Sequence, residues 1–110
     1  MEVYWTQGAT GDLFVLMDSL ISQQGIPPHI VRKIIAPIFI RMKSLTHIPH
    51  YGMPEPLLLD RNKRYRYLHE GSYKVIYRVT KTVIFIIAVV DAEKMPEKIQ
   101  DKPEQFELGF

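Results

Sequence analysis

Hydrophobic residues in the first half of the chain recur at the spacing of amphipathic helices. A β-branched and aromatic segment at residues 3–6 comes first and predicts a short strand that ends in a glycine-containing turn. Gly25 follows the first helical stripe and is a suitable C-terminal cap for that helix. This first stripe, with Phe14 beside it, consists of Leu13, Leu16, Met17, Leu20 and Ile21.

A second amphipathic helix is predicted after the Pro27-Pro28 pair, because proline at the first helical position loses no needed hydrogen-bond donor. Two adjacent helices of this kind imply an antiparallel hairpin. Pro37 lies inside the second stripe and is expected to kink or split the helix, at a cost of roughly 3 kcal/mol unless packing compensates. The inner face of this helix consists of Val31, Ile34, Ile35, Ile38, Met42 and Leu45, with Arg32, Lys33, Arg41 and Lys43 outside.

In the second half of the chain, apolar and polar residues alternate at every second position, which is the period of a β-strand. A proline-rich loop at residues 46–56 precedes an extended segment in which Arg64 and Arg66 share one face and Tyr65, Tyr67 and His69 share the other. After a turn at Glu70-Gly71, residues 72–79 alternate cleanly, and residues 83–90 are apolar on both faces, which is typical of a central strand. These segments predict an antiparallel meander.

Together these elements predict an α+β fold: an N-terminal strand, a two-helix hairpin and an antiparallel β-meander, with the hairpin on one face of the sheet. A length of 110 residues suits one compact domain. We expect that domain to span residues 1–99, followed by an acidic C-terminal tail at residues 100–110. The charged chain after Asp91 is expected to be exposed, with room for one helical turn.

Charge is distributed unevenly along the chain. The net charge is +2, but residues 1–28 carry −3, residues 29–81 carry +8 and residues 82–110 carry −3. A basic middle third favours a polyanionic partner, either nucleic acid or an acidic protein segment, because local potential steers association. The alternative is an ordinary solvated surface rich in lysine and arginine.

Several classes of function have no support in the residues. The chain has no cysteine, and its longest apolar run, residues 83–90, has eight residues where a membrane-spanning helix needs roughly 20. We therefore expect neither secretion nor membrane insertion. His47 and His50 lack two further ligands at a suitable spacing, so no metal site is predicted, and no phosphate-binding loop or other cofactor motif is present.

Three segments together resemble the RelE/ParE superfamily of toxins from type II toxin-antitoxin systems. The most specific is an arginine-bearing strand and a glycine turn followed by Tyr73-Lys74-Val75-Ile76-Tyr77-Arg78-Val79. The other two are the start, Val3-Tyr4-Trp5-Thr6 with Ala9 and Asp12-Leu13, and the ending from Val89 to Ile99. The resemblance covers about residues 2–99.

The resemblance implies a cytoplasmic, growth-inhibiting protein of the plasmid-stabilisation type, which forms a hetero-oligomer with a cognate antitoxin. It also implies one of two targets: ParE-like members poison DNA gyrase, and RelE-like members cleave mRNA on the ribosome. RelE-like nucleases place arginine and a tyrosine or histidine after the last strand, whereas this segment reads Asp91-Ala92-Glu93-Lys94-Met95-Pro96. An acid followed by Pro-Glu-Lys looks more like the ParE-type branch, which we favour.

The residues expected to contact the target or RNA are cationic, with one tyrosine. Tyr73 and Tyr77 are interpreted as half-buried core aromatics, with base stacking as the alternative. If the protein is an RNase, Tyr77 and Lys94 are its proton-transfer candidates; a module that only binds antitoxin is the third possibility. The predicted contact residues are Arg64, Arg66, Lys74, Tyr77, Arg78 and Lys94.

Overall fold

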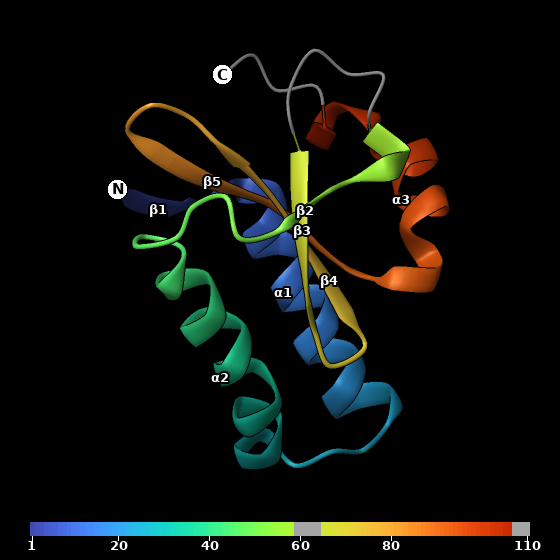
Figure 1. Cartoon of the computed structure of the whole chain (residues 1–110). Coiled ribbons are helices and arrows are strands. Elements are labelled where there is room, and N and C mark those ends of the chain that lie inside the picture. Colours follow the sequence, from blue (N-terminus) through green and yellow to red (C-terminus); the bar gives the residue numbers. More distant parts are fainter. Residues whose placement is uncertain (59–64, 107–110) are drawn as a thin grey trace.

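The computed structural model describes residues 1–58 and 65–106 and has three layers, with helices on both faces of one sheet (Figure 1). The helices are α1 (Gln7–Asp18), which continues into a π-helical turn (Ser19–Gln23), α2 (Pro28–Ser44) and α3 (Met95–Asp101). The strands are β1 (Glu2–Trp5), β2 (Met53–Pro54), β3 (Tyr65–Glu70), β4 (Tyr73–Val79) and β5 (Val83–Asp91). Short 3₁₀ turns occupy Pro56–Leu58, Ala92–Lys94 and Pro103–Phe106.

The sheet has the strand order β1-β5-β4-β3-β2. β3, β4 and β5 form the predicted antiparallel meander. β5 is an interior strand of the sheet, with β1 and β4 on its two sides. β1 pairs parallel to β5, from Glu2 opposite Val83 to Trp5 opposite Ile86, so the sheet is mixed. The predicted α+β fold is confirmed.

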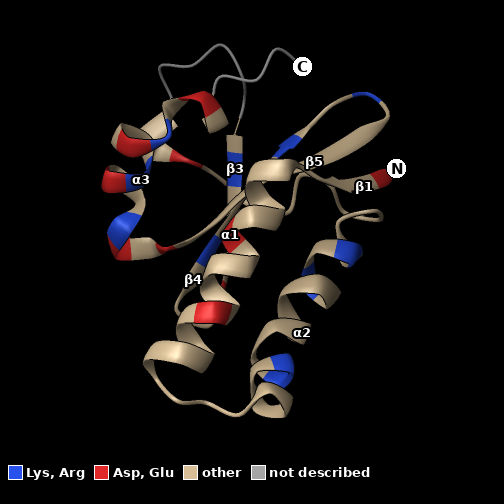
Figure 2. Ribbon diagram, turned by 180° about the vertical axis from the view of Figure 1, so that it is seen from behind, with Lys and Arg blue, Asp and Glu red and all other residues tan. Residues whose placement is uncertain are grey.

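The helical hairpin packs on one face of the sheet, as predicted (Figures 1 and 2). α2 begins at Pro28, and Gly25 adopts a positive φ of 66° beyond the end of the first helix, where only glycine is free of strain. Pro37 does not split α2, which runs unbroken to Ser44. Ile35 and Ile38 flank this proline and are buried, so tertiary packing anchors the helix on both sides of it.

α1 starts at Gln7, earlier than the sequence pattern predicts, and Gly8 and Gly11 lie inside the helix instead of in a turn. Thr6 caps the helix by accepting a hydrogen bond from the amide of Ala9 at 3.2 Å. The reason for glycine at position 8 is tertiary, because a Cβ there would stand 2.7 Å from the side chain of Gln105.

The C-terminal segment covers the opposite face of the sheet. The prediction of an exposed tail is wrong at Gln105 and Phe106, which are buried, whereas residues 100–104 are exposed. Met95 and Phe106 are completely buried against β3, β4 and β5. The Tyr65 hydroxyl donates a hydrogen bond to the carbonyl of Phe106, and the two rings meet edge to face. Residues 107–110 of the predicted tail lie outside the described residues.

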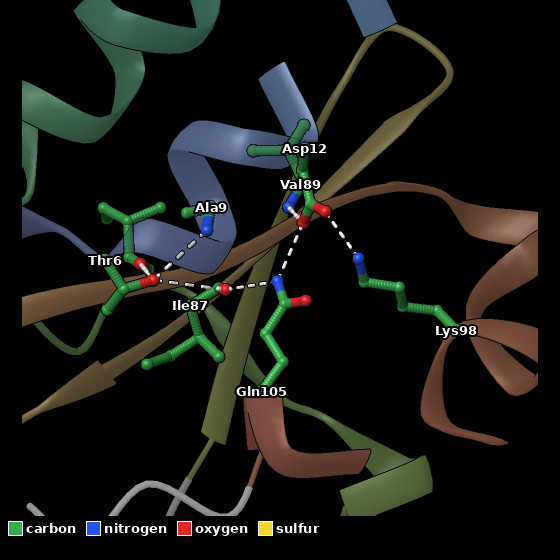
Figure 3. Close-up of polar contacts among 8 residues, drawn as sticks. Thr6, Ala9, Asp12, Ile87, Val89, Lys98 and Gln105 are labelled. Atoms are coloured by element: carbon green, nitrogen blue, oxygen red, sulfur yellow. Dashed lines mark hydrogen bonds and ion pairs between the residues drawn. The ribbon is translucent and has the colours of Figure 1, made fainter. Parts of the chain in front are cut away.

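Side chains close the edge of β5 where β1 ends (Figure 3). The Thr6 hydroxyl donates to the Ile86 carbonyl at 2.8 Å, and the Gln105 amide donates to the Ile87 carbonyl at 2.8 Å. Two residues further along β5, the Val89 amide donates to the Asp12 carboxylate at 2.9 Å. A strand edge without a partner exposes unpaired backbone groups. These contacts satisfy the backbone groups of β5 with which a longer β1 would pair.

Asp12 joins the three layers. Its carboxylate accepts from Val89 on β5, from Lys98 on α3 and from Gln105 in the last 3₁₀ turn (Figure 3). Lys98 and Asp12 also form an ion pair that is largely shielded from solvent. The C-terminal layer is therefore fixed to α1 as well as to the sheet. Among the described residues, no helix is long and apolar enough to cross a membrane.

Candidate target-contact surface

The pairing of β3 with β4 divides the predicted contact residues between the two faces of the sheet. Arg66 stands opposite Tyr77, and Tyr65 stands opposite Arg78. Residues directly opposite each other share a face, so Arg66 lies on the hairpin face, whereas Lys74 and Arg78 lie on the face of the C-terminal layer. Arg66 and Tyr65 point to opposite faces, as the sequence pattern predicts. Arg64 lies outside the described residues.

Arg66 ties down the loop that precedes β2. Its Nη1 donates to the carbonyl of Gly52 at 2.7 Å and to that of His50 at 3.4 Å. The side chain is half-buried. Part of the guanidinium is therefore engaged inside the protein, and the rest lies at the sheet edge beside the exposed loop.

Arg41 on α2 is a second cation on the hairpin face, which the sequence interpretation placed among the outer residues of the helix. Its guanidinium lies 5.8 Å from the centre of the Tyr51 ring and 3.9 Å from the Glu70 carboxylate. A cation over an exposed aromatic ring is a suitable contact for a base or a peptide. Sequence periodicity could not reveal this cluster, because Tyr51 belongs to an irregular loop.

Lys74 is largely buried and already neutralised. Its ammonium forms an ion pair with Glu55 at 2.7 Å and lies 4.2 Å from the centre of the Tyr67 ring. Glu55 is itself 1% exposed. The charge of Lys74 is therefore neutralised inside the domain, and Lys74 contributes little positive potential to the surface. The sequence offered one signal: Glu55 is the first acid after Asp18.

Tyr77 is a core residue, which confirms its interpretation as a core aromatic. The side chain is 0% exposed, and its hydroxyl oxygen accepts a hydrogen bond from the Gly52 amide at 2.7 Å. Glycine is required at position 52, because a Cβ there would lie 2.4 Å from that oxygen. Burial raises the pKa of Tyr77 above its ordinary value, against smaller opposing effects of the Gly52 hydrogen bond and the Arg66 charge. A buried, protonated phenol has no access to a macromolecular target in this conformation.

The raised pKa of Tyr77 predicts a loss of stability at alkaline pH. The folded state favours the neutral phenol, so this contribution is complete below the ordinary tyrosine pKa of about 10 and disappears as the pH rises through the folded-state pKa. Tyr77→Phe is expected to reduce stability at neutral pH by about 1–3 kcal/mol, because the buried Gly52 amide loses its acceptor. Between about pH 9 and pH 11, on either side of the ordinary tyrosine pKa of about 10, the free energy of unfolding should fall less in the variant than in the parent chain. Urea unfolding measures both. An equal alkaline loss in both proteins would contradict this.

Arg78 and Lys94 lie far from each other. Arg78 pairs with Phe85 near one end of β5, whereas Lys94 follows Asp91, which pairs with Tyr73 at the other end. Five residues of strand separate Tyr73 from Arg78, a distance of about 16 Å. Lys94 is exposed and shares a cleft of about 390 Å³ with Asp91 and Glu97, so no strong positive potential develops there. Burial, with the nearby Asp91 charge, raises the pKa of Tyr73 in the same cleft.

The structure therefore gathers none of the proposed proton-transfer groups around a common point: Tyr77 is buried and Lys94 is remote from Arg78. What it does present is exposed apolar surface on the hairpin, where Ile40 is 70% and Phe14 68% exposed. Exposed large apolar side chains are typical of protein interaction sites. The other exposed apolar residues of the hairpin are Val15, Ile21, Ile30 and Phe39.

Comparisons with known proteins agree with this fold. The chain is similar in structure to a chain described as "Chromosomal ParDE TA system from P. aeruginosa", with a TM-score of 0.65 and 23% sequence identity. The match covers 83% of this chain and 95% of that one. A comparison with curated protein sequences gave no match. The two chains therefore share a fold.

The family model for the ParE toxin of the type II toxin-antitoxin system parDE matches residues 3–96. The chain belongs to the ParE toxin family, which confirms the resemblance drawn from the sequence. The family description also implies a cognate antitoxin of the ParD type as the partner.

Proposed function

We propose that this ParE-family chain arrests bacterial growth by binding and inhibiting DNA gyrase, and that a cognate antitoxin neutralises it. The observation that carries the proposal is a surface suited to binding without a cluster suited to catalysis. Cutting RNA without a metal requires a proton acceptor and a proton donor beside the reacting phosphate. Tyr77 is buried, Lys74 is paired with Glu55, and Lys94 lies at the far end of the sheet from Arg78.

The candidate target-contact residues on this proposal are Arg66, Arg78 and Lys94, with Arg41 added by the structure. Arg66 and Arg41 lie on the hairpin face near the exposed ring of Tyr51. Arg64 remains a sequence-based candidate. A gyrase target would place the protein in the bacterial cytoplasm.

The antitoxin contact is supported by the exposed apolar side chains of the hairpin. An acidic and hydrophobic segment, disordered alone, would fold over Phe14, Phe39 and Ile40 and be attracted by the basic residues of α2. Covering these side chains would bury surface that makes the isolated toxin prone to aggregate.

Expression of this chain alone in a bacterial host that carries a DNA-damage reporter tests the target. We expect growth arrest together with reporter induction, since trapped gyrase leaves broken DNA. Arrest with a silent reporter would instead favour cleavage of mRNA on the ribosome. Normal growth with a silent reporter would indicate a domain that binds antitoxin and inhibits nothing.

The antitoxin interface is tested by Ile40→Ser, with Leu57→Ser as the matched control. Both side chains are exposed, but Leu57 lies in the 3₁₀ turn after β2, away from the hairpin. We expect Ile40→Ser to weaken antitoxin binding at least tenfold in calorimetry, about 1.4 kcal/mol, and Leu57→Ser to leave it unchanged. Equal affinities for the two variants would place the antitoxin elsewhere.

A further inference from the structure

α2 concentrates basic residues without acidic ones. Residues 19–54, which include all of α2, contain four lysines and arginines and no acidic residue, and they also contain His29, His47 and His50. Residues 92–106, which form the C-terminal layer, carry a net charge of −1. In Figure 2, α2 shows basic segments only, whereas α3 carries acids as well. α2 is therefore a basic element with no acid of its own, and the molecule would approach a polyanion with α2 foremost.

Three cations lie along the exposed outer surface of α2. Arg32 and Lys43 are eleven residues apart, so at 100° per residue they lie within about 20° of each other around the helix and about 16 Å apart along it. Lys33 lies about 100° away on the same exposed half. Among the described residues, none of these three side chains forms an ion pair. They differ in this from Lys74 and Lys98, whose charges are neutralised within the fold.

From this arrangement we infer that the outer face of α2 binds the phosphate backbone of duplex DNA. Each strand of duplex DNA presents a phosphate charge about every 3.4 Å of the helix axis, so a row of about 16 Å spans several phosphates on one strand. The inference rests on the proposed function, because an inhibitor of gyrase works beside the duplex that gyrase holds. It adds a second contact to that function, with the DNA itself, and this contact is independent of base sequence because phosphate contacts carry no sequence information.

The same face explains how an antitoxin could block this contact. Ile40 and Phe39 lie on α2 between the basic ends of the helix, and both are exposed. An antitoxin segment packed on them would occupy the space that the duplex needs. DNA and antitoxin are therefore expected to compete for the full chain.

The test uses the full chain and a fluorescently labelled duplex of about 20 base pairs, followed by anisotropy across salt concentrations. Three phosphate contacts predict a slope of about −2.7 in log K against log salt, which is roughly a 40-fold loss of affinity between 50 and 200 mM. Arg32→Gln/Lys43→Gln is expected to reduce that slope to about −0.9. The control, Lys81→Gln/Lys102→Gln, removes the same charge from exposed sites outside α2 and should keep the parent slope.

Two results would overturn the inference: no duplex binding at about 50 mM salt, the low end of the salt range used for the predicted slope, or equal weakening of duplex binding by the two double variants. A gyrase supercoiling assay on the same proteins separates this inference from the proposed function. Gyrase inhibition without any DNA binding by the toxin would remove only the α2 contact. DNA binding through α2 by a chain that leaves gyrase active would support the contact and remove the gyrase proposal.

Discussion

Lys74→Met is expected to destabilise the domain by about 3–5 kcal/mol, because it leaves the Glu55 carboxylate buried without its cation. Glu55 is 1% exposed, and its ion pair with Lys74 at 2.7 Å is the charge contact that the structure provides for it. Methionine keeps most of the length of the lysine stem, so the loss reports the charge and not a cavity. The free energy of unfolding in urea, followed by circular dichroism, measures the effect.

Two comparisons make this prediction specific. Arg41→Met breaks a pair with Glu70 that is 3.9 Å long and substantially exposed, so a loss of at most about 1 kcal/mol is expected. Lys74→Met/Glu55→Gln removes both charges and should recover part of the stability lost in the single variant. If Lys74→Met cost no more than Arg41→Met, the buried pair would not be holding the loop of residues 51–58 to the sheet.

The meander could be predicted from sequence because its signals are local. Strict alternation along residues 72–79 gives the two faces of β4, and the turn before it has Gly71 at a φ of 60°, which favours glycine. The eight-residue apolar run gives a strand with both faces covered. The helical hairpin follows from the three-and-four spacing and from Pro28 at the start of α2.

The start of α1 could not be predicted from local signals. Gly8 and Gly11 look like turn residues in the sequence, but Gly8 is glycine because Gln105 packs on it from the far end of the chain. Thr6 then serves both as the helix cap and as a donor to the Ile86 carbonyl of β5. The boundary is set by a tertiary contact, and such contacts override local propensity.

The candidate surface was predicted in part. Alternation correctly separates Arg66 from Tyr65, but it cannot show that Lys74 and Arg78 face the C-terminal layer while Arg66 faces the hairpin. That result depends on the register between β3 and β4. The pairing of Lys74 with Glu55 depends on how a proline-rich loop folds back on the sheet, for which sequence has no periodic signal.

The C-terminal layer was mispredicted because its charges suggest a solvated segment. Its few apolar residues are separated by charged ones, yet they pack against the second face of the meander. They are Met95, Ile99 and Phe106. A sheet in which both faces are apolar must be covered on both sides. The apolar character of β5 therefore implied a second covering layer, and residues 95–106 are the segment that supplies it.

Phe106→Ala is expected to cost about 3–5 kcal/mol, as for other phenylalanines removed from a packed core. The Phe106 ring is 0% exposed and contacts Tyr65 edge to face, and its carbonyl accepts the Tyr65 hydroxyl. Phe14→Ala is the matched control, because Phe14 is 68% exposed and its truncation should change stability by no more than about 0.5 kcal/mol. Urea unfolding of the two variants measures the difference.

The unfolding transition is also expected to be a single step. Asp12 binds Lys98, Gln105 and the Val89 amide together, so the C-terminal layer and the β5 edge should unfold with the sheet in one step. Loosening that layer by Phe106→Ala would uncover the Ile87 and Val89 backbone, and an uncovered strand edge promotes aggregation. A loss for Phe106→Ala as small as that for Phe14→Ala would mean that the segment after α3 is a tail attached to an already complete domain.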